Sequence, residues 1–483
     1  MDIKVISKNV GRALLFSALF MFLSMLVSLL NGKDSALGPL SISFIVTFIV
    51  GIFPFIFVRK SAAISLQDGF MIIILSWLLS FIFGMLPYVL WGGEFTLVNA
   101  WFESVSGYTT TGSTILEDVE ALPKGLQFWR SSTHFIGGLG VVVFLLLVMP
   151  DASPFRLRLT NIELSSLSRE GYRYRSMKTV NIIAFVYVGL AALQTVCLML
   201  AGMSFFDAVN HSFSTVATGG FSTRGESIAY YDSAAINIII IVFMTLASIH
   251  FGLIFGIVVT RSFKPFTTPV VKFYLGTLAV LSVMVTLSLK FSGTVEQWGQ
   301  AAMDATFQVT SFLTTTGFGT ADNVQWPVFA NVLLLYAAFQ CGCSGSTTGG
   351  VKSDRVLITV RAIGQQIRKR LHPSSISQVR VGNHLLREDA VMPAILYIVL
   401  YIFVLLISFL LVLLCGVEVS EAFSGVLASI GNVGPGLDSI GTMGNYSAQP
   451  LVAKLIYSLD MFLGRVEIYP AIVVFSLLFR RDK

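Results

Sequence analysis

Four short segments of this chain share a spacing that could build a site for a dehydrated cation. Each begins with an acidic or amide residue followed by alanine, and a glycine stands twelve residues after each alanine. The opening pairs are Asn99-Ala100, Asp207-Ala208, Asp304-Ala305 and Glu421-Ala422, and the glycines are Gly112, Gly220, Gly317 and Gly434. Repetition at a fixed spacing indicates a repeated structural unit. We therefore expect fourfold pseudo-symmetry around four glycine loops.

The chemistry that such loops suit is coordination by backbone oxygens. Rings of carbonyl groups replace the hydration shell of a monovalent cation in ion-selective filters. Glycine allows the positive φ angles that turn successive carbonyls toward one axis, and a short helix ending before the loop directs its negative end at the ion. The predicted ligands are the carbonyl oxygens of Thr110, Thr111, Gly112, Thr218, Gly219, Gly220, Thr315, Thr316, Gly317, Asn432, Val433 and Gly434.

Two features of these loops stay open at this point. The threonine hydroxyls either add ligands or hydrogen-bond the loop. Glycine and threonine also allow close helix packing in membranes, although four glycines at one offset favour the filter. The fourth loop has Asn432 and Pro435 in place of the threonine and phenylalanine of the second and third loops, so the filter is predicted to be asymmetric.

The elements that position these loops are predicted to be membrane helices. The 483 residues are 55% hydrophobic and 12% charged, with a mean hydropathy of +0.80, whereas soluble domains have about 25% charged residues. The first apolar run, from about Ala13, lacks a small-residue cleavage site and reads as a transmembrane helix. Runs long enough to cross a bilayer lie near 13–31, 39–58, 69–91, 126–149, 178–201, 233–260, 270–291, 328–360, 390–416 and 450–479.

The order of the segments predicts the fold. Four times a long run leads into a short segment, a glycine loop and a second run. Irregular backbone at membrane depth is tolerated only inside protein or along a cavity. We predict an all-α polytopic membrane protein with four pseudo-symmetric helix, pore helix, helix units around one central pore and two extra N-terminal transmembrane helices. The predicted divisions are 1–62 for the N-terminal pair and 63–155, 156–264, 265–372 and 373–483 for the units.

Basic residues in the connections predict the orientation. They fall on one side of the ten-span arrangement, which places both termini and the links between units in the cytoplasm. This accounts for the net charge of +6 without nucleic acid. The acids of the other side either form an outer vestibule that concentrates cations or are ordinary solvated charges; they are Glu94, Glu103, Glu117, Asp118, Glu120, Glu226, Asp232, Asp322 and Asp438.

The strings TTTGS, HSFSTVATGGFST, TTTGFG and GNVGPGL resemble the Trk/Ktr/HKT superfamily of potassium transporters, most closely the membrane subunit of bacterial Trk systems. The resemblance covers essentially the whole chain. It implies potassium uptake across the bacterial cytoplasmic (inner) membrane, a homodimer, and a cytoplasmic nucleotide-binding regulatory subunit of the TrkA type. In this family a glycine in all four loops goes with potassium preference, and some plant relatives with serine in the first loop favour sodium. Gly112 stands at that position.

The segment 341–350 is rich in glycine and serine and interrupts the second run of the third unit. Glycine costs about 1 kcal/mol relative to alanine inside a helix, so we expect a break there. The segment is similar to the intramembrane loop that acts as a gate below the filter in this family; a close-packed kink is the alternative. The gate residues implied are Gly342, Ser344, Gly345, Ser346, Gly349 and Gly350.

The last span contains Asp460, Arg465 and Glu467. Ionisable residues inside a membrane span are functional candidates. Gly464-Arg465-Val466-Glu467 is similar to a string in the family's final helix, which implies that Arg465 lines the pore below the filter and raises the barrier to cations. The alternative is a buried ion pair, with Asp460 or another span as the partner, because residues two apart do not face each other on a helix. Arg130 and His134 are weaker candidates, which we interpret as packing or interfacial residues.

No catalytic motif is present, and no cofactor is expected besides potassium as the transported ion. One alternative is a sodium-coupled or sodium-permeable transporter of the Ktr or HKT kind. A polytopic membrane enzyme is a distant alternative that would require acidic residues and histidines clustered at one membrane face. A gated channel and an ion-coupled symport are both compatible with the sequence. Basic cytoplasmic segments at 156–178 and 361–387 suit membrane lipid or a soluble subunit, and unpaired packing thiols are predicted at Cys197, Cys341, Cys343 and Cys415.

Overall fold

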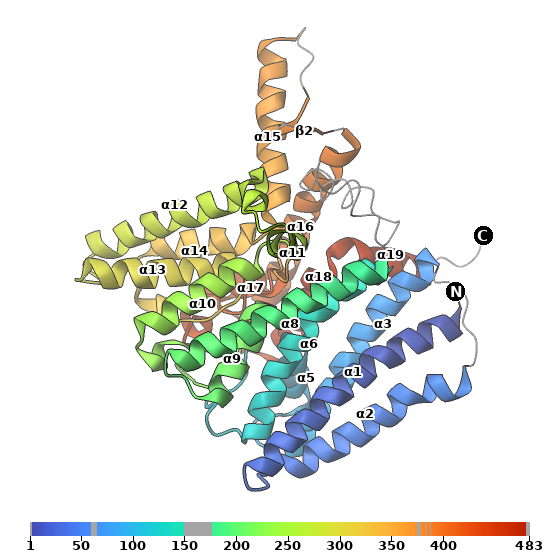
Figure 1. The fold of residues 1–483 in the computed structure, drawn as a ribbon. Helices are drawn as coiled ribbons and strands as arrows, with labels where there is room; N and C mark the ends of the chain where they lie inside the picture. Colours follow the sequence, from blue (N-terminus) through green and yellow to red (C-terminus); the bar gives the residue numbers. More distant parts are fainter. Residues whose placement is uncertain are drawn as a thin grey trace.

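The predicted all-α architecture is confirmed (Figure 1). The computed structural model describes residues 2–58, 65–148, 176–373, 378–382, 384–386 and 388–479. In these ranges the strands are one antiparallel pair, β1 (Arg380–Val381) and β2 (His384–Leu385). The α-helices are α1 (Ile3–Leu30), α2 (Leu37–Phe57), α3 (Leu66–Gly84), α4 (Leu86–Trp91), α5 (Leu97–Tyr108), α6 (Lys124–Val148), α8 (Ser176–Leu200), α9 (Phe205–Ala217), α10 (Ala234–Ala247), α11 (Phe251–Thr260), α12 (Pro269–Phe291), α13 (Trp298–Leu313), α14 (Val328–Gln340), α15 (Ser353–Leu371), α16 (Glu388–Leu414), α17 (Val419–Ile430), α18 (Leu451–Val466) and α19 (Ile468–Phe479).

Short 3-10 turns complete the described elements. They are η1 (Ala229–Tyr231), η2 (Lys264–Thr267), η3 (Asn323–Gln325) and η4 (Asp438–Ile440). The N-terminal pair α1 and α2 pack along each other, and α1 also contacts α3 and α6. The predicted boundaries near residues 62 and 155, and most of the basic segment 156–178, lie outside the described residues. The division into units therefore stays a prediction.

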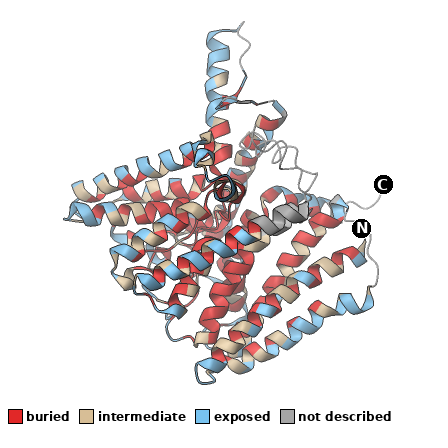
Figure 2. Ribbon diagram, viewed as in Figure 1, coloured by how far each residue is buried: buried red, intermediate tan, exposed pale blue. Residues whose placement is uncertain are grey.

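Six described helices are long and apolar enough to cross a membrane, and a seventh span results if α10 and α11 count as one. The other three predicted runs correspond to α6, to α14 with α15, and to α18 with α19. Figure 2 shows buried residues concentrated in the centre and exposed residues along the outer helices. Much of the exposed outer surface is apolar, with Ile49 57% and Phe403 61% exposed, as suits contact with lipid.

Two predicted continuous runs are in fact broken. The run 233–260 divides into α10 and α11, which meet at an angle of 101°. His250 caps α11, because its Nδ1 accepts a hydrogen bond of 3.0 Å from the backbone N–H of Gly252. The run 450–479 divides at Glu467, whose φ of +61° cannot continue a helix. A polar side chain within an apolar run marks each break, and the sequence analysis did not use that signal.

Candidate functional site

Each glycine loop follows a short helix, namely α5, α9, α13 or α17. In α5 and α9 the first residue of the repeated pair lies in the first turn, and a hydroxyl side chain caps it. Ser204 Oγ accepts the N–H of Asp207 at 3.1 Å, and Thr96 Oγ1 accepts that of Asn99 at 3.3 Å, so a polar or acidic residue meets the positive end of the helix dipole. The second residue of every pair is fully buried, at Ala100, Ala208, Ala305 and Ala422. In α13 the pair lies further from the helix start than in the other three.

The four loops have the same backbone conformation. The residue two before each glycine lies in the left-handed region, which is uncommon for non-glycine residues. Its N–H donates to the carbonyl three residues earlier at 3.0–3.1 Å, and the next N–H donates to the carbonyl five residues earlier at 2.8–2.9 Å. These bonds resemble a helix C-cap. The φ values are +53° at Thr110, +54° at Thr218, +55° at Thr315 and +53° at Asn432.

The four glycines form a closed ring. All have positive φ, from +79° to +100°. A Cβ atom built on each would lie closer than 3.0 Å to a carbonyl oxygen of the next loop, a distance that real Cβ atoms do not show. The partners run in order around the ring: Gly112 with Gly219 O, Gly220 with Thr316 O, Gly317 with Val433 O, and Gly434 with Thr111 O. The predicted filter residues are therefore brought together, and each glycine is required by a close approach.

Most threonine hydroxyls of the loops bind the protein itself. Thr111 Oγ1 lies 2.8 Å from Thr109 Oγ1 and accepts from Asn432 Nδ2 at 3.0 Å. Thr316 Oγ1 makes the same contact with Thr314 at 2.8 Å. Among the described residues, Thr110 Oγ1 has no hydrogen-bond partner. The hydroxyls therefore mainly brace the loops, which leaves the backbone carbonyls as the repeated oxygen donors.

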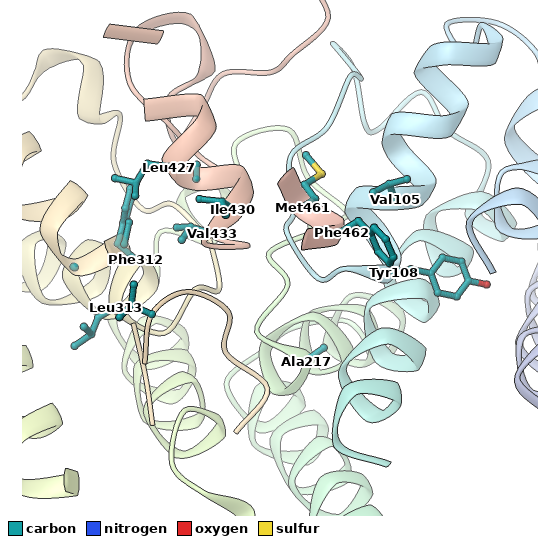
Figure 3. Close-up of a cluster of buried hydrophobic side chains, with 14 of the residues drawn as sticks. Val105, Tyr108, Ala217, Phe312, Leu313, Leu427, Ile430, Val433, Met461 and Phe462 are labelled. Atoms are coloured by element: carbon teal, nitrogen blue, oxygen red, sulfur yellow. The ribbon is translucent and has the colours of Figure 1, made fainter. Parts of the chain in front are cut away.

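Buried side chains of the short helices belong to one hydrophobic core. Figure 3 labels Val105 and Tyr108 of α5, Phe312 and Leu313 of α13, and Ile430 of α17 around the same region. All five are buried. Close packing of this kind resists displacement of the short helices that lead into the loops.

Hydrogen bonds join neighbouring loops beyond the ring. The second and third are linked by the Ile228 N–H to Gly319 O, at 3.1 Å. The third and fourth are linked by Asn323 Nδ2 to Gly436 O, at 3.3 Å. The fourth and first are linked by Ser113 Oγ to Gly434 O, also at 3.1 Å. Such long-range partners leave no periodic signal, and sequence reasoning missed them.

Arg130 of α6 is paired with Glu103 of α5 and also contacts the second loop, so it connects the surroundings of the first two loops. Arg130 Nε lies 2.8 Å from Glu103 Oε1, and both side chains are at most 2% exposed. Arg130 also donates to Ser222 O at 3.3 Å, and its guanidinium lies 4.1 Å from the centre of the Phe221 ring. The His134 ring stacks on Phe221 with centres 4.1 Å apart. Arg130 and His134 are therefore buried in contact with other residues of the protein, and their interpretation as packing or interfacial residues stays a prediction.

The placement of Glu103 corrects the sequence analysis. It is neither a vestibule charge nor a solvated one, because its carboxylate is fully buried and accepts hydrogen bonds from Arg130, Thr114 and Ile115. The other predicted outer acids are exposed, except for Asp322, which is half-buried. A buried carboxylate needs this complete set of partners. Proximity to an arginine 27 residues away could not be read from spacing.

Glu103→Gln should destabilise the protein strongly. Removing one member of a buried ion pair leaves the other charge uncompensated, at a cost of about 3–5 kcal/mol. We expect a clear fall in the melting temperature of the purified protein. The matched control is Glu117→Gln, because Glu117 is an exposed glutamate in the connection between α5 and α6. Equal melting temperatures of the two variants would show that the pair does not hold the loops together.

Arg224 connects the second loop to its surroundings. Its guanidinium lies 3.1 Å from Glu120 Oε2 and 3.4 Å from Asp207 Oδ2. Burial raises the pKa of Asp207, but the hydrogen bonds from Thr223 and Ser204 and the charges of His211 and Arg224 together outweigh it, so the pKa lies below its ordinary value. Asp207 therefore remains a carboxylate near neutral pH and holds both the helix start and the arginine.

Residues 341–352 separate α14 from α15, and we call them the intramembrane loop. The loop packs against the break between α10 and α11, since Cys343 N–H donates to Ser248 O at 2.9 Å and Phe251 N–H to Gly345 O at 3.3 Å. Its own hydrogen bonds define its shape. They are Ser344 Oγ to Asp354 Oδ1 at 2.6 Å, Ser346 Oγ to Cys343 O at 2.6 Å, and Ser353 N–H to Gly342 O at 2.8 Å. The interruption occurs where the glycine content predicts it.

The intramembrane loop also touches the glycine loops. Gly349 N–H donates to Thr315 Oγ1 at 3.1 Å, and Thr347 Oγ1 donates to Val216 O at 3.1 Å. Gly349 and Gly350 have no space for a side chain, because a Cβ would meet Gly431 O in the first case and Cys341 Sγ in the second. The predicted gate segment is therefore tightly packed beside the predicted filter.

Arg465 binds this same loop. It is 3% exposed and donates from Nη1 to Thr347 O at 2.5 Å and from Nη2 to Gly137 O at 3.4 Å. Asp460 is not its partner, because Asp460 Oδ1 accepts from Ser408 Oγ at 2.7 Å. The alternative of a buried ion pair for Arg465 is thus wrong within the described residues, where its partners are backbone carbonyls.

The neighbouring charges form separate contacts. Glu467 lies 2.9 Å from Arg355 Nη2. The Arg355 guanidinium also lies 3.8 Å from the centre of the Tyr397 ring, and Lys352 Nζ donates to the carbonyl of Thr348. Arg355 and Lys352 are buried, so they belong to the packed region behind the intramembrane loop.

Comparison with known proteins identifies the family. A family model described as "Cation transport protein" (TrkH) matches residues 40–483. The chain is 33% identical over 486 residues to the Trk system potassium uptake protein TrkH of Salmonella typhimurium, covering 100% of both chains. It is 32% identical over 492 residues to the Trk system potassium uptake protein TrkG of Escherichia coli, covering 99% of both.

A solved structure agrees with these relatives. The crystal structure of the potassium transporter TrkH from Vibrio parahaemolyticus matches with a TM-score of 0.89 and 30% identity, covering 100% of both chains. The matched proteins are named as transporters, so the distant alternative of a membrane enzyme is wrong. The chain belongs to the TrkH family of cation transport proteins.

Proposed function

We propose that this protein takes up potassium through a filter formed by the four glycine loops. The observation that carries the proposal is the closed ring in which each glycine contacts a carbonyl oxygen of the next loop. Backbone carbonyls held in a ring replace the hydration shell of a monovalent cation. The names of the relatives, which are potassium uptake proteins, support potassium as that cation. The predicted ion ligands are the backbone carbonyls of the twelve loop residues named above.

The intramembrane loop and Arg465 serve as the gate in this proposal. Three contacts support it: the loop touches Thr315 of the third glycine loop, and Arg465 binds both Thr347 of the intramembrane loop and Gly137 of α6. A buried positive charge beside the path of a cation raises its barrier. Opening would therefore require the loop and the arginine to move together.

The orientation and partners follow from the charges and the family. The projecting end of α15 (Figure 1) carries Arg368, Lys369 and Arg370, which the positive-inside rule assigns to the cytoplasm. With both termini on that side, the protein is a multi-pass protein of the bacterial cytoplasmic membrane. From the resemblance of the chain to its family, we also propose that the protein forms a homodimer and binds a cytoplasmic nucleotide-binding subunit of the TrkA type.

The test is uptake of Rb⁺, as a potassium analogue, by proteoliposomes that contain the purified protein. K⁺ should suppress the uptake, and equal concentrations of Na⁺ and Li⁺ should not, because the carbonyl ring suits the larger ion. Suppression by Na⁺ as strong as that by K⁺ would favour the sodium-permeable alternative. Absence of uptake both alone and with the cytoplasmic subunit added would contradict the proposal.

A further inference from the structure

We propose that the side-chain hydroxyl of Thr315 is a latch that couples the third glycine loop to the intramembrane loop. The proposal rests on the function proposed above and assigns to one filter residue a second task beside ion coordination. Its hydroxyl oxygen accepts the backbone N–H of Gly349 at 3.1 Å. Both residues are buried, and they lie 34 positions apart in the chain.

Comparison of the four equivalent positions shows that this contact is specific to the third loop. Thr110, Thr218, Thr315 and Asn432 share the same left-handed backbone. Thr110 Oγ1 has no partner among the described residues, and Thr218 Oγ1 donates to Ala217 O at 2.7 Å. The fourfold repeat of the backbone therefore does not require the bond to the intramembrane loop. The bond arises from the position of Gly349.

Gly349 is held at this place by more than one contact. A Cβ on Gly349 would lie closer than 3.0 Å to Gly431 O and to both Oδ1 and Cβ of Asn432. The N–H of Gly349 donates to the third glycine loop, and the α-carbon of Gly349 packs against the fourth glycine loop. The position of the intramembrane loop and the shape of these two glycine loops therefore depend on each other.

Movement of the intramembrane loop must break the Thr315 bond. A buried N–H and a buried hydroxyl would then lack a partner unless water or a cation replaced it. The bond thus favours the packed position of the loop. Coupling of two sites is reciprocal, so an ion that changes the third glycine loop also changes the tendency of the intramembrane loop to move.

The thiols of the intramembrane loop report its position without any measurement of flux. Cys341 and Cys343 are buried here, at 0% and 2% exposure. Modification by a small cationic methanethiosulfonate, quantified by mass spectrometry, measures how often the loop exposes them. Cys197 and Cys415 are partly exposed outside this region and serve as internal controls in the same sample.

The decisive variant is Thr315→Val, which keeps the β-branched shape and removes the acceptor. We expect the rate of modification of Cys341 and Cys343 to rise about two- to tenfold, the change that loss of one hydrogen bond produces in an equilibrium. Thr315→Ser restores the acceptor and should restore the wild-type rate. The matched control is Thr110→Val, which removes a hydroxyl at the equivalent position and should leave the rate unchanged.

A second readout separates coupling from loosened packing. In wild-type protein the modification rate should depend on the K⁺ concentration, and Thr315→Val should weaken that dependence. An unchanged rate in Thr315→Val, or an equal rise in Thr110→Val, would overturn the latch. If the valine variant does not fold, Thr315→Ala compared with Thr110→Ala makes the same test. Failure of the proposed function would instead appear as Rb⁺ uptake that K⁺ does not suppress, whatever the thiols show.

Discussion

Gly112→Ser is expected to lower the preference for K⁺ over Na⁺ by about tenfold or more, equivalent to about 1.4 kcal/mol. A Cβ at this position would lie closer than 3.0 Å to Gly219 O. The clash forces that carbonyl out of the ring or widens the contact between the first and second loops. Because selectivity depends on the number and arrangement of the carbonyls, one displaced oxygen weakens the discrimination between the ions.

The measurement is Rb⁺ uptake into proteoliposomes with Na⁺ or K⁺ as competitor. Gly416→Ser is the matched control, because Gly416 has a φ of +85°, close to the +86° of Gly112, but no atom within 4 Å of an added Cβ. It bears the same backbone strain as Gly112→Ser without the clash. Unchanged selectivity in Gly112→Ser would remove the first loop from the filter, and an equal change in both variants would assign the effect to strain.

The sequence predicted those parts of the candidate site that repeat along the chain. The glycines at a fixed offset from Ala100, Ala208, Ala305 and Ala422 lie in one ring, and the buried alanines explain the offset, because each short helix needs a small residue at the same depth. Composition was enough to predict the break at residues 341–350. Local preferences and periodicity therefore account for the helices and for the loops between them.

What the sequence did not provide are contacts between residues far apart. Its position in the sequence places Glu103 with the outer acids, although Arg130 holds it inside the protein. The sequence offers a carboxylate as one candidate partner of Arg465, although the carbonyls of Thr347 and Gly137 accept its hydrogen bonds. Such pairings depend on the relative placement of helices, which no single stretch of sequence encodes.

The breaks in the last runs of the second and fourth units show a third kind of limit. Both runs are apolar enough to be read as single helices, because one polar residue hardly lowers the mean hydropathy of a long run. His250 and Glu467 mark the actual breaks. An ionisable residue inside an apolar run is costly unless it finds a partner, and here His250 caps α11 while Glu467 pairs with Arg355.

Arg465→Ala should increase the rate of cation uptake. A unit charge about 8 Å from an ion, at an effective dielectric constant of about 20, contributes about 2 kcal/mol to the barrier, so its removal should raise the flux roughly 30-fold. Alanine also removes the hydrogen bonds that hold Thr347 and Gly137 together. Both effects act in the same direction, and Rb⁺ uptake by proteoliposomes measures their sum.

Arg465→Lys separates the two effects. Lysine keeps the charge but cannot hold two carbonyls in the fork geometry of a guanidinium. If the charge dominates, the lysine variant stays near the wild-type flux; if the hydrogen bonds dominate, it approaches the alanine variant. Flux that is unchanged in Arg465→Ala would contradict a gating role for the arginine. Selectivity should be unchanged in both variants, since the carbonyl contacts of the glycine ring do not involve Arg465.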